Sequence, residues 1–422
     1  MLIKLIAALR AFYRTKRLTR QLSTRTDVVA WQRAQLARFL RRDIQRVAFY
    51  ESKGAWDLSD LPMIDKAELM KNFDQFNRAK ISATEIRTAL DAGAEHVRGY
   101  VVGQSTGTSG NRGLFVISEA ERFTWLGVIL AKTLPDFPWV RHKVALILPG
   151  YGQIFKSAAQ IGRLNVRFFD LRHGIDRWVD ELINYDPDTI MAPPKVLRAV
   201  AERTKIKPHN VFSGAEVLDP IDRQMIEASF GTHVREIYMA TEGLFGVACR
   251  LGVLHLAEEF VTFEFEPLPG SDLVTPLITD FTRTTQIMAR YRMNDLLRLS
   301  PQPCRCGSPL QAVAEIVGRQ DDVFRLGPNT ILITPDILRN AILDADRRID
   351  DFRLVQTGQS HIALHLAANL PAEAGRAACV NLAAVLGRAG ATGVEINMIN
   401  RIEPPTAHKL RRVRCDWRCD QL

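Results

Sequence analysis

The sequence predicts an α/β protein, with a large N-terminal domain on mixed, largely parallel sheets and a small α+β domain at the C-terminus. Its 422 residues suffice for one large and one smaller domain. Short apolar runs of strand type alternate with helical runs between residues 98 and 280. After "GRQDD" the pattern restarts as a compact unit. We therefore divide the chain into residues 1–50, 51–318 and 319–422.

The first 50 residues predict a basic helical segment. They hold 12 Lys and Arg against 2 Asp and Glu, while the whole chain has a net charge of +9, so the remainder is nearly neutral. Such a segment suits an acidic protein, an anionic membrane surface or a solvated helix face. Nucleic acid is not expected, because no binding motif is present. The helical spacing is carried by Leu36, Phe39, Leu40, Ile44 and Val47.

The elements that follow are predicted from local patterns. In "IDKAEL" a helix begins with Asp65 as its N-cap. Strands are predicted at "VRGYVVG", "VALILPG", "VRFFDL", "TIMAPP" and "VREIYMA", with helices at "EAERFTWLGVILAKTL" and "IDRWVDELINY". Antiparallel strands are predicted at "FVTFEFEPL", "LVTPLITDFT" and "QIMARYRMNDLLRL".

Composition excludes several classes of protein. With 46% hydrophobic and 24% charged residues, the chain reads as globular, and its apolar runs are too short to span a membrane. The N-terminus lacks a cleavage site and resembles an amphipathic helix more than a signal peptide. Six cysteines are too few for a secreted disulfide framework of this length. A cytoplasmic location is expected.

A glycine- and hydroxyl-rich stretch, "STGTSGNRG" from Ser105 to Gly113, is the first candidate binding element. It is either a flexible turn or a phosphate-binding loop with backbone N–H groups and hydroxyls directed at the anion. It lacks the Gly-Lys-Ser/Thr end of a Walker loop. By itself the stretch leaves both readings open.

Two further stretches place polar side chains at strand ends. In "YMATEG" a carboxylate, Glu242, could hold Mg²⁺, and Thr241 could donate to a phosphate. In "YRMND" the carboxylate of Asp295 could accept both hydroxyls of a ribose. Each has an ordinary alternative, a solvated glutamate and a turn-capping aspartate.

The order of the motifs is more informative than any one of them. "STGTSGNRG", "GAE", "YMATEG", "YRMND", "GRQDD" and "HKLRRV" follow one another as in the adenylate-forming superfamily. The series resembles that family's phenylacetate–CoA ligase and capsule-type branch most closely. "VAFYESKG" and "LSDLPMIDKAELMKNF" resemble the N-terminal part of that branch, so the similarity runs from about residue 46 to 414.

The resemblance implies a role for each matching residue. Catalysis would fall to Lys409, Thr241 and Glu242, the last also holding Mg²⁺. ATP would be bound by Ser105, Thr106, Gly107, Thr108, Ser109, Gly110, Arg112, Gly214, Ala215, Glu216, Tyr238, Asp295 and Arg319. Asp321 and Asp322 would mark the hinge of a mobile C-terminal lid, and Tyr151 with Gly152 would line the acid pocket, with Trp125 and Phe212 as further walls.

The sequence departs from the family pattern in two places. Asn111 and Arg112 stand where many relatives have a lysine, so phosphate charge would be neutralised by Arg112 or Mg²⁺. "HKLRRV" replaces the commoner Gly-Lys, which loosens the register of Lys409. Its ordinary alternative is a solvated lysine in a basic tail.

Four residues predict a structural zinc site. Cys249 and His255 are spaced C-x5-H, and Cys304 and Cys306 form "CRCG" about fifty residues later. Three thiolates and one imidazole are a tetrahedral zinc set, with buried free cysteines as the alternative. Some phenylacetate–CoA ligase relatives carry a similar site.

The resemblance implies an AMP-forming ligase that activates a carboxylic acid and passes it to a thiol, and it favours an aromatic acid. Coenzyme A is the expected acceptor. The alternatives are a carrier-protein phosphopantetheine, adenylylation of a deazaflavin cofactor, a nucleotide sensor without turnover, and a membrane-peripheral scaffold. ATP, Mg²⁺, coenzyme A and zinc are the expected cofactors.

Overall fold

In a computed structural model the protein is described over residues 2–51, 57–105, 113–149, 160–161, 163–402 and 410–417. These residues form two compact units. Unit 1 comprises residues 1–293 and 299–315, and unit 2 comprises residues 294–298 and 316–422. Strands β15 (Asp295–Leu299) and β16 (Ala312–Arg319) hold residues of both units.

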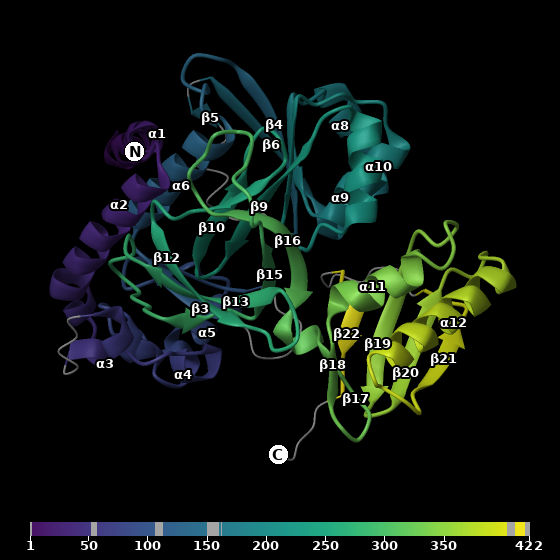
Figure 1. Ribbon diagram of the computed structural model, residues 1–422. Coiled ribbons are helices and arrows are strands. Elements are labelled where there is room, and N and C mark those ends of the chain that lie inside the picture. Colours follow the sequence, from purple (N-terminus) through teal and green to yellow (C-terminus); the bar gives the residue numbers. More distant parts are fainter. Residues whose placement is uncertain are drawn as a thin grey trace. The chain divides into compact units, whose positions relative to one another are not determined.

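The centre of unit 1 is a parallel sheet with helices on both faces (Figure 1). Its strands run in the order β6-β4-β7-β8-β9, all neighbours being parallel. They are β4 (His142–Leu148), β6 (Leu164–Asp170), β7 (Thr189–Ala192), β8 (Asn210–Gly214) and β9 (Val234–Ala240). One face is covered by α8 (Val179–Tyr185), α9 (Pro194–Arg203) and α10 (Pro220–Phe230). The other is covered by α6 (Glu119–Thr133).

Antiparallel strands extend this sheet. β5 (Gln160–Ile161) pairs with β6, and β10 (Gly243–Ala248) follows β9 and pairs with β11 (Leu254–Leu256). The same 13-stranded sheet includes β12 (Val261–Pro267), β13 (Leu273–Asp280) and β14 (Tyr291–Arg292). A separate three-stranded sheet is formed by β1 (His96–Val97), β2 (Tyr100–Gln104) and β3 (Leu114–Ile117).

The N-terminal segment is part of the core of unit 1. Helix α1 (Leu2–Gln21) lies along α6, with Phe12 almost fully buried in the same cluster as the α6 residues. At Gly127 of α6, a Cβ atom would lie 2.1 Å from the carbonyl oxygen of Ala8. The two backbones therefore touch where α6 has no side chain. Helix α2 (Arg25–Arg38), π-helical η1 (Phe39–Asp43), 3-10 helix η2 (Ile44–Arg46) and α3 (Ala48–Glu51) follow.

Short helices connect this segment to the sheets. They are η3 (Leu58–Asp60), α4 (Lys66–Lys71), η4 (Phe73–Phe76) and α5 (Ala83–Asp91). Asp65 caps α4, because its carboxylate accepts from the backbone N–H of Glu68 at 2.9 Å. The predicted N-cap is confirmed.

Unit 2 is a small α+β fold. Its sheet has the order β21-β20-β19-β22. The strands are β19 (Phe352–Gly358), β20 (His361–Leu366), β21 (Glu395–Ile399) and β22 (Val413–Cys415), with β17 (Phe324–Leu326) and β18 (Ile331–Ile333) as a hairpin. Helices α11 (Pro335–Leu343) and α12 (Ala372–Arg388) pack against the same apolar core.

The predicted fold class is confirmed, both in the α/β character of unit 1 and in the separate C-terminal α+β unit. The predicted parallel strands from β4 to β9 and the predicted antiparallel group pair as expected. "VRGYVVG" differs, because the chain turns back at Gly99 and its two strands, β1 and β2, pair antiparallel in the separate three-stranded sheet. The stretch "IDRWVDELINY" was predicted as one helix, but in the structure a 3-10 helix, η6 (Ile175–Arg177), precedes the α-helix α8. The three-part division of the chain, with its lid domain from residue 319, stays a prediction. Among the described residues, no helix is both long and apolar enough to cross a membrane.

Candidate functional site

The turn between β9 and β10 carries Thr241 and Glu242. It follows the carboxyl end of a parallel strand, the edge at which α/β sheets bind ligands. The Thr241 hydroxyl donates to Glu242 Oε2 at 2.8 Å, and the Tyr291 hydroxyl donates to Glu242 Oε1 at 3.1 Å. Both carboxylate oxygens are thus oriented by hydroxyl groups, while the half-buried side chain keeps access to a ligand.

A half-buried arginine, Arg283, also supports this turn. Arg283 donates through Nη2 to the Thr241 carbonyl oxygen at 2.8 Å, and its Nη1 is buried without a hydrogen-bond partner among the described residues. Asp280 accepts from the Thr282 N–H at 2.8 Å and hydroxyl at 2.6 Å. Burial raises the pKa of Asp280, and the Arg283 charge opposes that rise. Arg283 therefore brings positive charge to the base of the Thr241 turn.

The glycine-rich stretch connects β2 to β3. At its base the Ser105 N–H donates to the Gly113 carbonyl at 2.7 Å, and the Gly113 N–H donates to Ser105 Oγ at 2.9 Å. The hairpin pair Gln104 and Leu114 lies directly below. Ser105 thus closes the loop with its side chain as well as its backbone. Residues 106–112, which include the rest of the predicted phosphate loop, lie outside the described residues.

Three side chains converge at Gly113. A Cβ atom placed there would lie 3.6 Å from Lys66 Cε, 3.6 Å from Thr241 Oγ1 and 3.7 Å from Ser105 Oγ. A lysine, a threonine and a serine from three distant parts of the chain thus surround one backbone position. Glycine leaves that space open, so an anion could approach the Lys66 ammonium group and the hydroxyls of Ser105 and Thr241 there.

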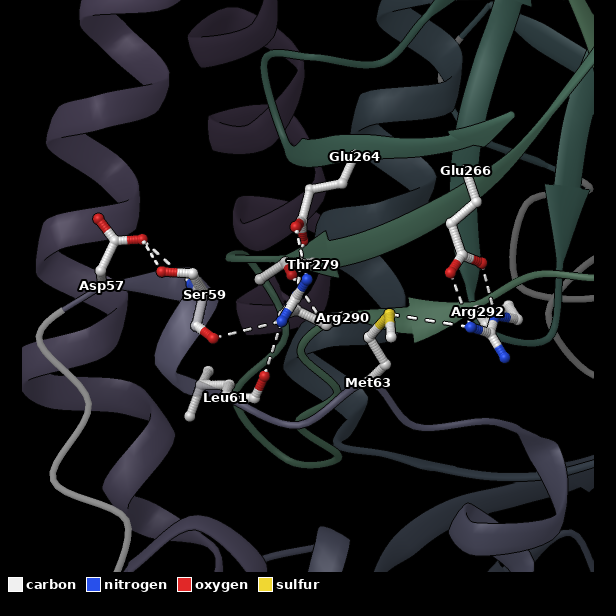
Figure 2. Close-up of polar contacts among 9 residues, drawn as sticks. All are labelled: Asp57, Ser59, Leu61, Met63, Glu264, Glu266, Thr279, Arg290 and Arg292. Carbon is white, nitrogen blue, oxygen red and sulfur yellow. Dashed lines mark hydrogen bonds and ion pairs between the residues drawn. The ribbon is translucent and has the colours of Figure 1, made fainter. Parts of the chain in front are cut away.

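The position of Lys66 is fixed by contacts between residues 57–66 and the antiparallel strands, shown in Figure 2. Arg290 donates to the Leu61 carbonyl at 2.9 Å and pairs with Glu264 on β12. Backbone bonds join Ile64 to Arg290 and Arg292 at 3.1 and 2.8 Å. Because Tyr291 lies between these two arginines, the same contacts position Lys66 and the hydroxyl that reaches Glu242.

Arg292 completes this attachment. It binds the Glu266 carboxylate through two bonds of 2.6 and 2.7 Å, a bidentate arrangement (Figure 2). The Glu266 pair raises the pKa of Arg292, so the charge persists at every physiological pH. The arrangement as a whole offers a cation, hydroxyl donors and an oriented carboxylate in one place. Those are the groups that bind phosphates together with a divalent cation.

The predicted adenine-site residues lie on adjacent strands. Gly214 ends β8 beside Ile237 of β9, and Ala215 follows with φ of 70°. Glu216 is buried and forms an ion pair with Lys195 at 3.5 Å. The Tyr238 ring packs against Phe245, with ring centres 5.3 Å apart. Their assignment to adenine stays a prediction.

The predicted ribose and hinge residues are described within unit 2. Asp295 begins β15 and Arg319 ends β16. The neighbouring Asn294 side chain donates to the Asp321 carboxylate at 2.6 Å. Asp322 pairs with Arg411, which links residue 411 back to this corner. Lys409, Tyr151 and Gly152 lie outside the described residues.

The four predicted zinc ligands come together in unit 1. Their ligand atoms all lie within 4.8 Å of one another. Cys249 Sγ is 3.9 Å from Cys304 Sγ, and Cys306 Sγ is 3.4 Å from His255 Nε2. Tetrahedral zinc places two sulfurs ~3.8 Å apart and a sulfur and a nitrogen ~3.5 Å apart. The cluster therefore has the dimensions of a closed zinc site.

The surroundings of this cluster suit a cation. The His255 Nδ1 lies 3.3 Å from the Leu310 carbonyl, which holds the ring with Nε2 directed at the thiols. Burial lowers the pKa of His255, so the ring is neutral. Burial and the neighbouring thiols raise the pKa of Cys306 to about 11. Thiolates in this setting need a metal ion to stabilise them.

Sequence reasoning missed Lys66, Arg283 and Tyr291. Lys66 was visible as the residue after a helix N-cap, yet nothing in the sequence connected it with the glycine-rich loop. Arg283 follows the end of β13, and Tyr291, the first residue of "YRMND", begins β14. Arg283 and Tyr291 contact Thr241 and Glu242 only because the strands β12 to β14 fold beside the Thr241 turn.

Replacing Tyr291 by phenylalanine removes the hydroxyl that orients Glu242. We expect Tyr291→Phe to raise the Mg²⁺ concentration required for half-maximal ATP-dependent activity by about 10-fold, as for other residues that orient a metal ligand. Tyr185→Phe is the control, since Tyr185 is also buried and its hydroxyl donates to the Asn165 carbonyl, away from the site. Equal Mg²⁺ requirements in both variants would contradict a role for Glu242 in metal binding.

Comparison with known proteins finds two curated relatives, each of which matches about half of this chain. No protein-family model matches the chain. The phenylacetate-coenzyme A ligase of Pseudomonas putida is 27% identical over 244 residues, covering 52% of this chain and 54% of that protein. Protein CapK of Staphylococcus aureus is 24% identical over 198 residues, covering 45% and 44%. The chain thus spans about half the length of these curated relatives.

A solved structure resembles the chain over almost its whole length. The 2-hydroxyisobutyryl-CoA ligase, in its postadenylation state with an acyl-AMP, superposes with a TM-score of 0.63 and 18% identity. The match covers 93% of this chain and 89% of that one. At this level of identity the likeness establishes the fold.

Proposed function

From the premise that the chain has the fold of the adenylate-forming superfamily and sequence similarity to its phenylacetate–CoA ligase-like branch, we propose that it is an AMP-forming acid–thiol ligase. It would activate a carboxylic acid with ATP as an acyl-adenylate and then transfer the acyl group to a thiol. The observation that carries the proposal is the convergence of Lys66, Ser105 and Thr241 around Gly113. This cluster is suited to hold the phosphates of a nucleotide.

In the first half-reaction a carboxylate oxygen attacks the α-phosphorus, the P–O bond to the β-phosphate breaks, and pyrophosphate leaves. Negative charge grows on the phosphate oxygens, so nearby cations and N–H donors lower the barrier. Lys66 would serve pyrophosphate, and the Thr241 hydroxyl would exchange its bond to Glu242 for one to the α-phosphate. Lys409 is proposed to approach the α-phosphate in this step.

Magnesium is the proposed cation of the site. Glu242 would hold it, in the orientation set by Thr241 and Tyr291. When bound, the ion would neutralise charge on the nucleotide phosphates. Gly214, Ala215, Glu216 and Tyr238 are proposed for adenine, and Asp295 with Arg319 for the nucleoside.

The acid and the acceptor are proposed more specifically from the relatives. The Pseudomonas protein is named for phenylacetate and coenzyme A, which favours an aromatic acid and coenzyme A here. A carrier-protein thiol is the competing acceptor. Zinc bound by Cys249, His255, Cys304 and Cys306 is proposed as a structural ion, because all four positions are filled by protein ligands.

Acid-dependent ATP–pyrophosphate exchange, measured without any thiol, tests this proposal. We expect exchange with aryl-acetates or benzoates, and weaker exchange with fatty acids or short hydroxy acids. Coenzyme A and a carrier protein can then be compared as acceptors by AMP release. ATP binding without exchange across the whole panel would overturn ligase activity and favour a nucleotide sensor.

If Lys409 has the proposed role, its substitution should affect the rate of adenylation but not the affinity for ATP. We expect Lys409→Ala to lower exchange by 10²–10³-fold, the usual loss for one charge-stabilising group, with ATP affinity retained. Arg414→Ala is the control, because it removes an exposed cation five residues further along the chain, on β22. Unchanged exchange in Lys409→Ala would exclude this lysine from adenylation.

A further inference from the structure

Four large apolar side chains lie exposed on α1 and the turn after α6. Ile6 and Tyr13 are 37% and 49% exposed, and Trp139 and Val140 are 55% and 46% exposed. Tyr13 and Trp139 meet edge to face, with ring centres 6.4 Å apart. We call these residues, together with the arginines of α1 described below, the aromatic–basic patch. Such a concentration of exposed apolar side chains indicates a contact surface.

The patch is held in place by buried contacts. Phe137, in the same turn as Trp139, packs edge to face on Phe12 of α1, with ring centres 5.0 Å apart. Lys16 donates to the Pro135 carbonyl at 2.7 Å and lies 5.1 Å from the centre of the Trp139 ring. The turn is therefore fastened to α1 at both ends. Trp139 is therefore held at an exposed position by the contacts of its neighbours with α1.

The exposed side of α1 is strongly basic. Residues 2–21 contain no Asp or Glu, and the helix carries six Lys and Arg. Among the described residues, no carboxylate pairs with the four exposed arginines of this helix: Arg10, Arg14, Arg17 and Arg20. Lys4 pairs with Glu119, and the nearby Asp136 is engaged by His142 at 3.1 Å. The arginines are therefore available to an anionic partner.

The arrangement resembles that of an interfacial helix. Ile6, Arg10, Tyr13, Arg17 and Arg20 follow the three- and four-residue spacing of one helix face. From Arg10 to Arg20 this row extends about 15 Å. Tryptophan and tyrosine favour the headgroup level of a bilayer, and arginines beside them bind anionic lipid phosphates.

We propose that the aromatic–basic patch binds the surface of an anionic lipid bilayer. Trp139, Tyr13 and Val140 would enter the headgroup region, while the arginines contact lipid phosphates. The charge complementarity favours a bilayer, since a row of arginines that pairs with no carboxylate among the described residues matches a surface of uniform negative charge. Such binding would place the protein at a membrane without a spanning helix, and it is independent of the proposed ligase reaction.

Vesicle co-sedimentation of the full-length protein tests this inference. We expect binding to phosphatidylcholine vesicles that contain 30% phosphatidylglycerol, and little binding to phosphatidylcholine alone. Each arginine at an anionic surface contributes about fivefold. The triple variant Arg10→Gln, Arg14→Gln, Arg17→Gln should therefore bind about 100-fold more weakly. Arg33→Gln, Arg38→Gln, Arg41→Gln is the matched control, with the same charge removed from exposed positions of α2 and η1.

The apolar part of the patch needs its own comparison. Trp139→Ala should weaken vesicle binding by about 10-fold and remove the blue shift of tryptophan fluorescence on binding. Ile183→Ala, at a similarly exposed position on α8, should bind as the parent does. Equal loss in both arginine triples would mean non-specific charge attraction and overturn the proposal. Binding of an acidic carrier protein, but not of vesicles, through the same arginines would assign the patch to a protein partner instead.

Discussion

Replacing Lys66 by methionine is expected to lower acid-dependent ATP–pyrophosphate exchange by 10²–10³-fold. The methionine keeps most of the aliphatic packing but removes the only charge that this side chain brings to Gly113. Loss of one preorganised donor at developing negative charge has an effect of that size. The same variant should bind adenosine and AMP normally, because they lack the β- and γ-phosphates, whereas the apparent affinity for pyrophosphate should fall.

Lys71→Met is the matched control for Lys66→Met. Lys71 ends the same helix, α4, and its side chain is exposed. It should retain full exchange and the same thermal midpoint as the parent. If both variants keep full exchange, Lys66 has no part in phosphate binding, and the charge of the loop must come from elsewhere. If Lys66→Met lowers the thermal midpoint as well, the pyrophosphate affinity still distinguishes a binding role from a structural one.

Cys306→Ser is expected to abolish zinc binding and to lower the thermal midpoint of unit 1 by on the order of 10 °C. A ligand that binds only the folded protein, at 1,000 times its dissociation constant, stabilises it by about 4 kcal/mol. In a domain of this size each kcal/mol corresponds to roughly 2–4 °C. Metal analysis of freshly purified protein should give about one zinc per chain, a ratio set by one four-ligand site.

Cys379→Ser is the control for this experiment. Cys379 is a partly buried free cysteine on α12 and lies outside the cluster. Its substitution should leave the zinc content and the midpoint of unit 1 unchanged. Parent protein that contains no zinc, when prepared without chelators, would contradict the metal assignment. In that case the three thiols would be buried free cysteines.

The elements that the sequence predicted well are those with a strong local pattern. The apolar runs of β4, β7 and β9 and the alternation with helices required a parallel sheet, and the capping side chain of Asp65 marked the start of α4. The clustering of Cys249, His255, Cys304 and Cys306 was also predicted from their spacing, while zinc binding itself stays a prediction. In each case the signal lies within a short stretch of chain.

The missing parts of the candidate site depend on distant contacts. Lys66 reaches Gly113 only because Arg290 and Arg292 fasten its segment to β12 and the residues after β13. Arg283 supports the Thr241 turn from a position 42 residues further along the chain. The arginines of the aromatic–basic patch were anticipated as part of a basic helix, but the exposed Trp139 lies in a different segment, the turn after α6. Contacts between segments so far apart in the sequence leave no local pattern from which they could be predicted.

The contact between α1 and α6 has a consequence for how related sequences can vary. Any side chain at residue 127 would collide with the backbone of α1 near Ala8, a backbone that cannot move aside as a flexible side chain can. Alanine at position 11 is confined in the same place, since its Cβ would lie 2.9 Å from that of residue 127. These positions should therefore covary. Homologues that keep the leading helix should retain glycine at 127, whereas lineages that have lost it are free to place larger residues there and bury α6 by other means.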